Sequence, residues 1–156
     1  MIDIDQILPN LYIGTYLKTP EDIQELKDTC GITAVLNLQT DEDLQEKGIH
    51  WPSMEGMYKK LGIEVHRVPM RDYDYDHQRD HLPEAVKALS GLLASGHVTY
   101  LHCNAGVSRA PLVAMAYLYW CRKMALEDAI NRVWGSRSCS PYLELLEEAP
   151  ENISSC

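Results

Sequence analysis

Five residues lie between Cys103 and Arg109, a spacing that lets a thiol and a guanidinium act on one phosphate group. Cys103 follows the segment from Val98 to His102, which we predict to be a buried strand, and Arg109 opens an expected helix. The N–H groups of the connecting loop and of the helix start would converge on a single anion. Gly106 lets the backbone approach that anion closely, and the planar fork of Arg109 can hold two of its oxygens. Thiols in such a field lose their proton easily, so the segment predicts a phosphate-binding loop with a reactive cysteine.

Three carboxyl groups upstream of this loop could supply the proton that a departing oxygen needs. Hydrolysis of a phosphomonoester requires an acid for the leaving oxygen and then a base for water, and one carboxyl group can serve as both in turn. The polar stretch from Arg71 to Arg79 holds Asp72, Asp74 and Asp76. For Asp74 and Asp76, membership of a solvated acidic loop is the alternative interpretation.

The elements that must position these groups alternate between strands and helices. Apolar or alternating runs predict strands within Gln6–Gly14, Ile32–Leu38, Ile63–Pro69 and Val98–His102. Helical spacing and capping residues predict helices from Thr19 to Gly31 and over 54–61, 82–94, 109–122, 126–133 and 141–148. We expect a break in the chain at Trp51-Pro52 and a loop over 71–79. This alternation predicts an α/β fold with a mainly parallel central sheet flanked by helices. A length of 156 residues predicts one domain over 1–156.

The segment His102-Cys103-Asn104-Ala105-Gly106-Val107-Ser108-Arg109 resembles the signature of the dual-specificity branch of the protein tyrosine phosphatase superfamily. The stretch Ile7–Gly14 resembles that family's opening strand, and Val35–Leu38 resembles the strand whose Asn braces the phosphate loop. The resemblance implies the dual-specificity phosphatase fold, with no cofactor and no metal. It implies Cys103 as nucleophile, Arg109 as phosphate clamp and Asp72 as general acid, with Asp74 as runner-up. The implied substrate-binding residues are His102, Asn104, Ala105, Gly106, Val107, Ser108 and Tyr73.

Other segments are similar to plant glucan (starch) phosphatases, which leaves the substrate open. They include Arg109-Ala110-Pro111, where protein phosphatases usually carry Ser or Thr after the arginine, and Arg137-Ser-Cys-Ser-Pro141. Ser108 and Tyr73 stand where glucan phosphatases have Gly and Phe. Three interpretations follow: a phosphatase acting on phosphotyrosine, phosphoserine and phosphothreonine in proteins, the same chemistry on a phosphorylated glucan, and a non-catalytic phosphate-binding module.

Several aromatic side chains have two interpretations each. Trp51, Tyr58, Tyr73 and Tyr75 could form a platform for sugar rings, whereas Trp51 and Tyr58 could equally be partly buried packing residues. Trp120 and Trp134 lie on expected amphipathic helices, and we expect both in the core.

Composition restricts the partners and the compartment. The net charge of −9 argues against nucleic acid and anionic membranes as partners, and no apolar run is long enough to span a bilayer. Five scattered cysteines without zinc-ligand spacing suit free thiols in a reducing compartment, although a disulfide between Cys103 and a second cysteine stays open. The N-terminus lacks a signal-peptide pattern. We therefore expect a cytoplasmic monomer, with an organelle after removal of a transit peptide as the alternative.

Overall fold

The computed structural model describes residues 2–148 and 156, and its centre is a five-stranded sheet. The strands are β1 (Ile4–Leu8), β2 (Leu11–Gly14), β3 (Ala34–Asn37), β4 (Glu64–Arg67) and β5 (Thr99–His102). Their order in the sheet is β1-β2-β5-β3-β4. Only the β1–β2 pair is antiparallel, while β2–β5, β5–β3 and β3–β4 are parallel. The predicted α/β fold with a mainly parallel sheet is confirmed.

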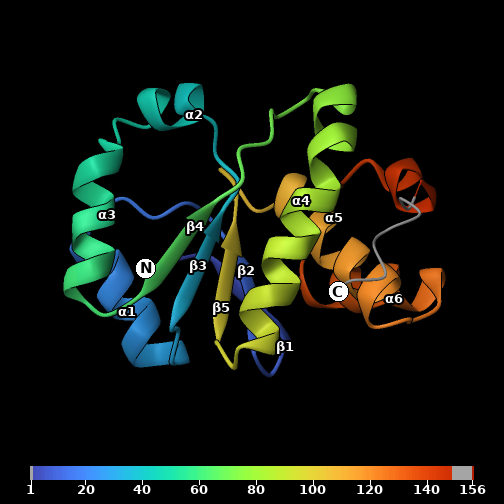
Figure 1. The fold of residues 1–156 in the computed structure, drawn as a ribbon, viewed down its shortest axis with the longest axis horizontal. Helices are drawn as coiled ribbons and strands as arrows, with labels where there is room; N and C mark the ends of the chain where they lie inside the picture. Colours follow the sequence, from blue (N-terminus) through green and yellow to red (C-terminus); the bar gives the residue numbers. More distant parts are fainter. Residues whose placement is uncertain (1, 149–155) are drawn as a thin grey trace.

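Helices cover both faces of this sheet (Figure 1). The α-helices are α1 (Pro20–Cys30), α2 (Asp41–Glu46), α3 (Trp51–Lys60), α4 (Tyr75–Ala94), α5 (Arg109–Ala116) and α6 (Leu126–Ser136). One face packs against α1 and α3 around buried residues such as Ile23, Val35 and Tyr58, and the other packs against α4, α5 and α6 around residues such as Leu36, Leu101 and Val113. These two apolar layers leave all four residues of β5 buried, which is typical of a central strand in a parallel sheet.

The acidic stretch after β3, which the sequence pattern left unassigned, is the short helix α2. Thr40 caps it, because its side chain accepts the N–H of Asp43 while the Asp43 carboxylate accepts the N–H of Thr40. The expected break at Trp51-Pro52 is wrong. Trp51 begins α3, and Pro52 lies in its first turn, where a missing N–H costs no hydrogen bond.

The expected loop over 71–79 is too long, since α4 already begins at Tyr75. Asp74 caps this helix by accepting the N–H of His77 at 3.0 Å. The first two turns are polar, and Pro83 lies inside the helix, so the helical pattern became visible in the sequence only from Leu82 onwards.

The last helices also differ from the expected ranges. The helix that begins at Arg109 is α-helical to Ala116 and continues as the π-helix η1 (Tyr117–Cys121). The expected helix over 141–148 is a single 3₁₀ segment, η2 (Leu143–Glu147). Trp120 is buried and donates its ring N–H to the carbonyl of Leu146, which joins η1 to η2.

The expectation of a buried Trp134 is wrong, because this residue is 46% exposed. On α6 the buried positions are Ala129 and Val133, four residues apart on one face. Trp134 follows Val133 directly and is therefore turned about 100° away from that face.

The expectation of free thiols throughout is corrected by a disulfide between Cys121 and Cys156. Cys121 ends η1, and the fold brings it next to Cys156 although 35 positions separate the two in the sequence. Cys30, Cys103 and Cys139 are free. The sequence could not show this pair, because the cysteines have no local spacing signal.

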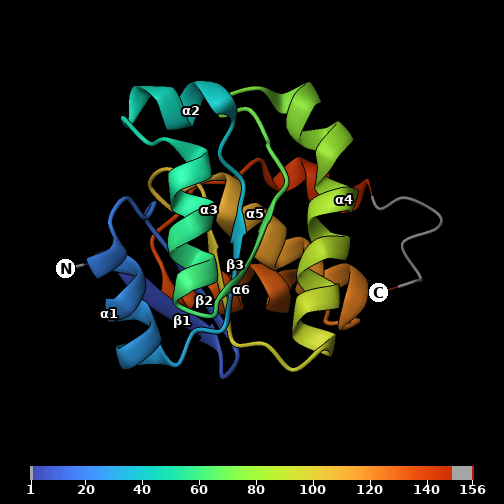
Figure 2. The ribbon, with the colours of Figure 1, turned by 60° about the vertical axis from the view of Figure 1, so that its left-hand side comes forward.

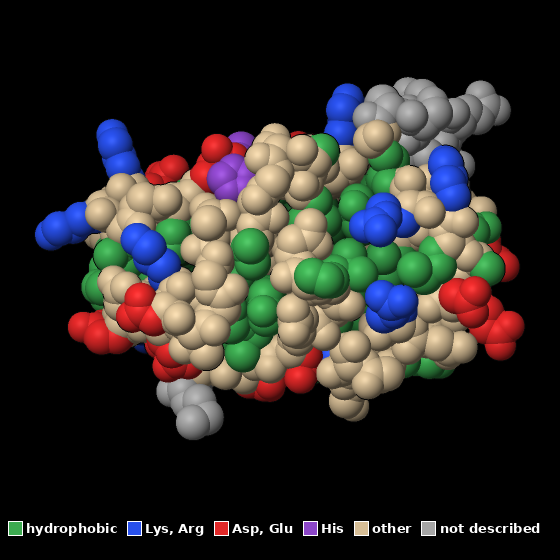
Figure 3. Space-filling model, turned by 90° about the horizontal axis from the view of Figure 1, so that it is seen from below, with side chains coloured by type: hydrophobic (Ala, Val, Ile, Leu, Met, Phe, Trp, Pro, Cys, Tyr) green, Lys and Arg blue, Asp and Glu red, His purple; other side chains and the backbone are tan. Residues whose placement is uncertain are grey.

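The carboxyl ends of the central strands meet at one end of the molecule. In the sheet register His102 pairs with Gly14 on one side and with Asn37 on the other, and Asn37 pairs with Arg67. The segments that follow these four residues, including α2 and the entry to α4, therefore lie together, at the top of Figures 1 and 2. On the opposite end, seen in Figure 3, Lys, Arg, Asp and Glu side chains are spread over both halves of the face. Within residues 2–148, the helices are too short or too polar to cross a bilayer.

Candidate active site

The loop from Cys103 to Ser108 connects the end of β5 to the start of α5, as the sequence predicted. Cys103 is 2% exposed, and Arg109, the first residue of α5, is fully buried. The loop begins at the buried centre of the sheet, since β5 lies between β2 and β3. An open α/β sheet binds its ligands at this carboxyl end of the strands.

Every backbone carbonyl of the loop accepts a hydrogen bond from outside it. The donors, in order from Cys103 O to Ser108 O, are His102 Nδ1 (2.9 Å), Tyr16 N (3.0 Å), Arg137 Nη2 (2.9 Å), Arg137 Nε (2.7 Å), Ser140 N (2.8 Å) and Leu112 N (3.1 Å). Because a trans peptide directs its C=O and N–H to opposite sides, the loop N–H groups face the inner side of the loop. Such a ring of N–H groups is a nest for an anion.

Gly106 is required for this loop to fit. Its φ is +69°, in the left-handed region. A Cβ atom here would lie 2.7 Å from the carbonyl oxygen of Gly14 and 2.9 Å from Nη2 of Arg137. A side chain at position 106 would therefore push the loop away from β2.

Arg109 has donors to spare at the base of the loop. Its Nη1 donates to Asp43 Oδ2 at 2.6 Å and to the carbonyl of Met70 at 2.8 Å. Nε and Nη2 are buried and have no hydrogen-bond partner among the described residues, although Nη2 lies 3.3 Å from Asp72 Oδ2. A guanidinium has five N–H donors, so three of them await a ligand. Unpaired buried donors are costly, which marks this edge of Arg109 as an oxyanion site.

Asp43, from α2, joins the loop to the arginine. Its Oδ1 accepts from Asn104 Nδ2 at 3.1 Å, and Oδ2 accepts from Arg109 and from the N–H of Thr40. Burial opposes ionisation of this carboxyl, but the hydrogen bonds and the charge of Arg109 outweigh it and lower the pKa of Asp43. The carboxylate therefore stays charged and holds Arg109 in one orientation.

Gln39 provides the contact that was expected from Asn37. The Asn37 side chain accepts the N–H of Gln39 at 2.7 Å, and Gln39 Nε2 donates to Asn104 Oδ1 at 2.8 Å. The strand that resembles the loop-bracing strand thus reaches the loop through its next polar residue.

His102 lies behind the loop and not in the pocket. Its side chain is buried, and Nδ1 donates to the carbonyl of Cys103. Burial, together with the charge of Arg109, lowers the pKa of His102 to about 4, against the effect of its backbone hydrogen bond. The ring is therefore neutral near pH 7 and serves as a hydrogen-bond donor to the loop.

The structure separates the three carboxyl candidates for the acid. Asp72 is partly buried, with Oδ2 at 3.3 Å from Arg109 Nη2, and it lines the same pocket as Cys103. Asp74 is occupied as the cap of α4, and Asp76 is exposed and pairs with Arg79 at 3.1 Å. Of the three, only Asp72 lines the pocket that contains Cys103.

The loop that carries Asp72 is anchored to α4. The buried Gln78 donates to the carbonyl of Arg71 at 2.9 Å, and the N–H of Arg71 donates to Nδ1 of His77 at 3.0 Å. Burial and the neighbouring His81 lower the pKa of His77, which keeps Nδ1 available as an acceptor. Tyr73 has a φ of 59° and is 87% exposed, so it projects from the tip of this loop.

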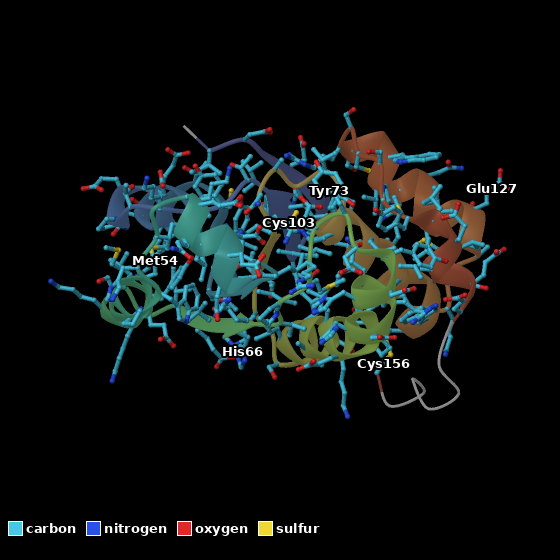
Figure 4. All side chains as sticks on the ribbon, turned by 90° about the horizontal axis from the view of Figure 1, so that it is seen from above. Met54, His66, Tyr73, Cys103, Glu127 and Cys156 are labelled. Atoms are coloured by element: carbon cyan, nitrogen blue, oxygen red, sulfur yellow. A yellow bond between two sulfur atoms is a disulfide. The ribbon has the colours of Figure 1, made fainter. Side chains whose placement is uncertain are left out.

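These residues surround a pocket of about 220 Å³. It is lined by Asp72, Tyr73, Cys103, Ala105, Val107, Ser108, Ser140 and Tyr142. Figure 4 looks down on this end of the molecule, where Cys103 and Tyr73 lie close together near the middle. The structure therefore unites most of the predicted substrate-binding residues, while His102, Asn104 and Gly106 lie behind or beside the pocket.

The four-residue aromatic platform is not present. Tyr58 is fully buried and packs 6.4 Å from Trp51, which is partly buried and stacks under Arg67. Tyr75 packs edge-on against Tyr142 at 5.4 Å. The interpretation of Trp51 and Tyr58 as packing residues is confirmed, and of the four only Tyr73 is largely open to a ligand.

Sequence reasoning missed several residues of the site, namely Gln39, Asp43, Arg137, Ser140 and Tyr142. They come from segments far from Cys103 in the sequence. Of the five, Arg137 and Ser140 lie in the segment Arg137–Pro141, whose similarity to glucan phosphatases was the available signal. In the part of the chain that is described, no group of three or more His, Cys, Asp or Glu side chains is placed to hold a metal ion.

Comparisons with known proteins agree with this geometry. Residues 11–147 match the family model for the dual specificity phosphatase catalytic domain. A phosphoglucan phosphatase of Castanea sativa, DSP4, described as amyloplastic, is 34% identical over 154 residues, which cover 97% of this chain and 41% of that protein. Mouse dual specificity protein phosphatase 2 is 30% identical over 129 residues, 82% of this chain and 36% of that protein. The chain thus spans less than half the length of these two relatives.

Solved structures share the fold. The structure of PTPMT1 in complex with PI(5)P superimposes with a TM-score of 0.78 at 21% identity, covering 97% of each chain. At this identity the likeness concerns the fold alone. It confirms the arrangement of sheet and helices that the motif resemblance implied.

Proposed function

The chain belongs to the dual specificity phosphatase family, and from this membership we propose that it is a cysteine-dependent phosphomonoester hydrolase. The observation that carries the proposal is the set of unpaired donors of Arg109, buried beside the pocket that contains the thiol of Cys103. A non-catalytic phosphate-binding module would need the donors alone. The presence of both the Cys103 thiol and the Asp72 carboxyl group in the lining of one pocket favours catalysis.

The first chemical step transfers the phosphoryl group to sulfur. The thiolate of Cys103 attacks phosphorus in line as the bond between phosphorus and the leaving oxygen breaks. Nε and Nη2 of Arg109 and the loop N–H groups hold the three equatorial oxygens, where negative charge accumulates. Asp72 gives its proton to the leaving oxygen, so the products are an alcohol and a phosphocysteine.

The second step returns the enzyme to its starting state. Asp72, now a carboxylate, accepts a proton from a water molecule whose oxygen attacks phosphorus. The bond between phosphorus and sulfur breaks, inorganic phosphate leaves, and Cys103 is again a thiolate. The proton that left Asp72 in the first step is thereby regained.

The substrate we propose first is a phosphorylated protein, with phosphotyrosine, phosphoserine or phosphothreonine as the reacting group. In support, mouse dual specificity protein phosphatase 2 aligns with 82% of the chain. The pocket lining also includes Val107 and Tyr142, whose apolar surfaces can contact a phosphorylated side chain. The wall residue Val107 is 40% exposed and thus accessible.

A phosphorylated glucan is the second candidate. It is supported by the 34% identity to a phosphoglucan phosphatase over 97% of the chain. The open ring of Tyr73 at the pocket mouth adds to this, because an exposed aromatic face can stack on a sugar ring.

Three further points belong to the proposal. The described residues share one sheet, which supports a single catalytic domain over 1–156. We propose a monomer, which size-exclusion chromatography with light scattering would test. We propose a cytoplasmic location, while the plastid named for the chestnut relative supports the organelle alternative.

Phosphate release from solubilised amylopectin and from a phosphotyrosyl peptide, compared at matched phosphate concentration, separates the two substrates. Faster release from the peptide supports the first candidate, and faster release from the glucan supports the second. The Cys103→Ser protein serves as the control in both arms. Release that persists in this variant would overturn the proposed chemistry.

A further inference from the structure

Arg137 contacts the phosphate loop from its outer side and has a hydrogen-bond partner for every donor. Nε donates to the carbonyl of Gly106 at 2.7 Å, and Nη2 donates to the carbonyl of Ala105 at 2.9 Å. The remaining donors bind Asp3 and Asp5 on the first strand. The side chain is only 5% exposed. Arg109 keeps three donors free for a ligand, whereas all five donors of Arg137 bind protein groups. Arg137 therefore holds parts of the protein together and has no donor left for a substrate.

The two carboxylates fix Arg137 against the loop. Nη1 lies 3.1 Å from Asp3 Oδ1 and 2.9 Å from Asp5 Oδ2, and Nη2 lies 3.2 Å from Asp3 Oδ2. Asp3 and Asp5 lie on the outermost strand of the sheet or just before it, 134 and 132 positions from Arg137. Both precede residue 11, where the family match begins.

We propose that Arg137 is a positioning residue for the reaction and that Asp3 and Asp5 act through it. The inference rests on the proposed function, because it assigns to Arg137 the orientation of the N–H groups that hold the phosphoryl oxygens. The first strand thereby becomes part of the machinery of the site.

The physical reason lies in the two peptide groups that Arg137 holds. When the carbonyls of Ala105 and Gly106 point to Arg137, the N–H groups of Gly106 and Val107 point to the phosphate. A rotated peptide would instead present a carbonyl oxygen to the phosphate and repel it. Gly106 has no side chain to resist this rotation, so an external contact has to hold these peptides. A guanidinium reaches both carbonyls at once, whereas a lysine ammonium is a point charge on a flexible stem.

The first test compares Arg137→Lys with Arg132→Lys. Arg132 is an exposed arginine on α6, the helix that ends just before Arg137, and no hydrogen bond joins its side chain to the loop, so it is the matched control. For each protein we would measure kcat/KM for an aryl phosphate, the inhibition constant of inorganic phosphate and the melting temperature. The kinetic measurements are made well below the melting temperature of each protein. We expect Arg137→Lys to lower kcat/KM by about 10- to 100-fold and to raise the phosphate inhibition constant by a similar factor, while Arg132→Lys stays at wild type.

The inhibition constant separates positioning from stability. A purely structural role would lower the melting temperature and leave the phosphate affinity of the folded protein unchanged, and that result would overturn the inference. Failure of the wild-type protein to turn over the aryl phosphate or to bind inorganic phosphate would instead count against the proposed function itself. The two failures are thus distinguishable.

A second test uses the double variant Asp3→Asn/Asp5→Asn, which leaves Arg137 in place. We expect it to reduce kcat/KM by about 3- to 10-fold in the wild-type background and to have no further effect in the Arg137→Lys background, since coupled residues are not additive. The variant Glu127→Gln/Asp128→Asn removes two exposed carboxylates from the start of α6, where Glu127 lies far from Cys103 in Figure 4, and serves as the control. Equal effects of the Asp3/Asp5 change in both backgrounds would show that the acids do not act through Arg137.

Discussion

Nη1 of Arg109 donates a 2.6 Å hydrogen bond to Oδ2 of Asp43, and this contact leaves the opposite edge of the guanidinium for a phosphate. Arg109 is fully buried and the Asp43 side chain is 11% exposed, so the pair is shielded from solvent. The same carboxylate accepts from Asn104 in the loop and from the backbone of Thr40. Asp43 therefore couples the orientation of the arginine to that of the loop.

Loss of this carboxylate should weaken both binding and folding. In Asp43→Asn, the charge that compensates Arg109 disappears while the shape is retained, and we expect kcat/KM to fall by about 10-fold and the free energy of unfolding by about 1–3 kcal/mol. Steady-state kinetics and urea denaturation measure the two effects. Asp41→Asn on the same helix is the control, because the Asp41 side chain is 92% exposed. A stability and rate equal to wild type in Asp43→Asn would contradict the coupling.

Replacement of the nucleophile should separate binding from turnover. We expect Cys103→Ser to lower turnover of an aryl phosphate by at least about 10³-fold, because a serine hydroxyl in this site has no base to ionise it. Calorimetric titration with inorganic phosphate should still detect binding, since Arg109 and the loop N–H groups remain. Residual turnover near the wild-type level would eliminate Cys103 as the nucleophile.

Truncation of Asp72 should mainly lower the reaction rate, whereas truncation of Asp74 should mainly lower the stability. We expect Asp72→Ala to lower kcat by about 10²- to 10⁴-fold for an alkyl phosphate, and by less for p-nitrophenyl phosphate, whose leaving oxygen needs little protonation. Asp74→Ala removes the cap of α4, so it should cost about 1 kcal/mol of stability and retain most of the rate. If Asp74→Ala proved the slower enzyme for the alkyl phosphate, the assignment of the acid would pass to Asp74.

His102 should make the stability depend on pH. Its pKa in the folded protein is about 4, below the ordinary value of 6.5, so the unfolded chain binds a proton that the folded chain does not bind between these values. The contribution of His102 to the free energy of unfolding is therefore fully present above about pH 6.5 and is lost as the pH falls towards 4. The loss amounts to about 3 kcal/mol at most.

Urea denaturation at pH 7, 6 and 5 measures this effect. The variant His102→Asn keeps a donor for the carbonyl of Cys103 but does not titrate, so its stability should fall less over the same range. Parallel pH dependence in the two proteins would show that His102 is not the group responsible.

The sequence by itself determined the parts of this protein that depend on local order. The spacing of Cys103 and Arg109, with Gly106 between them and an apolar run before them, specified a strand, an anion-binding loop and a helix start. The alternation of strands and helices specified a mainly parallel sheet. Both follow from short-range geometry, because side-chain periodicity and turn residues act over a few positions.

Local patterns misled where packing decides the outcome. Trp134 lies on a predicted amphipathic helix, yet it is exposed because Ala129 and Val133 occupy the buried face. The start of α4 was hidden by its polar first turns, which are held by contacts such as that of Gln78 with Arg71.

The tertiary structure alone decided which distant groups complete the site. Asp43, the partner of Arg109, lies 66 positions from it in the sequence, and Asp3, a partner of Arg137, lies 134 positions from it. No periodicity connects residues so far apart, and each of these charges alone is indistinguishable from an ordinary surface charge. Asp43 reaches Arg109 because parallel strands bring their carboxyl ends, and the loops that follow, to one edge of the sheet. Asp3 reaches the same edge because β1 runs antiparallel to β2, with Ile4 opposite Gly14.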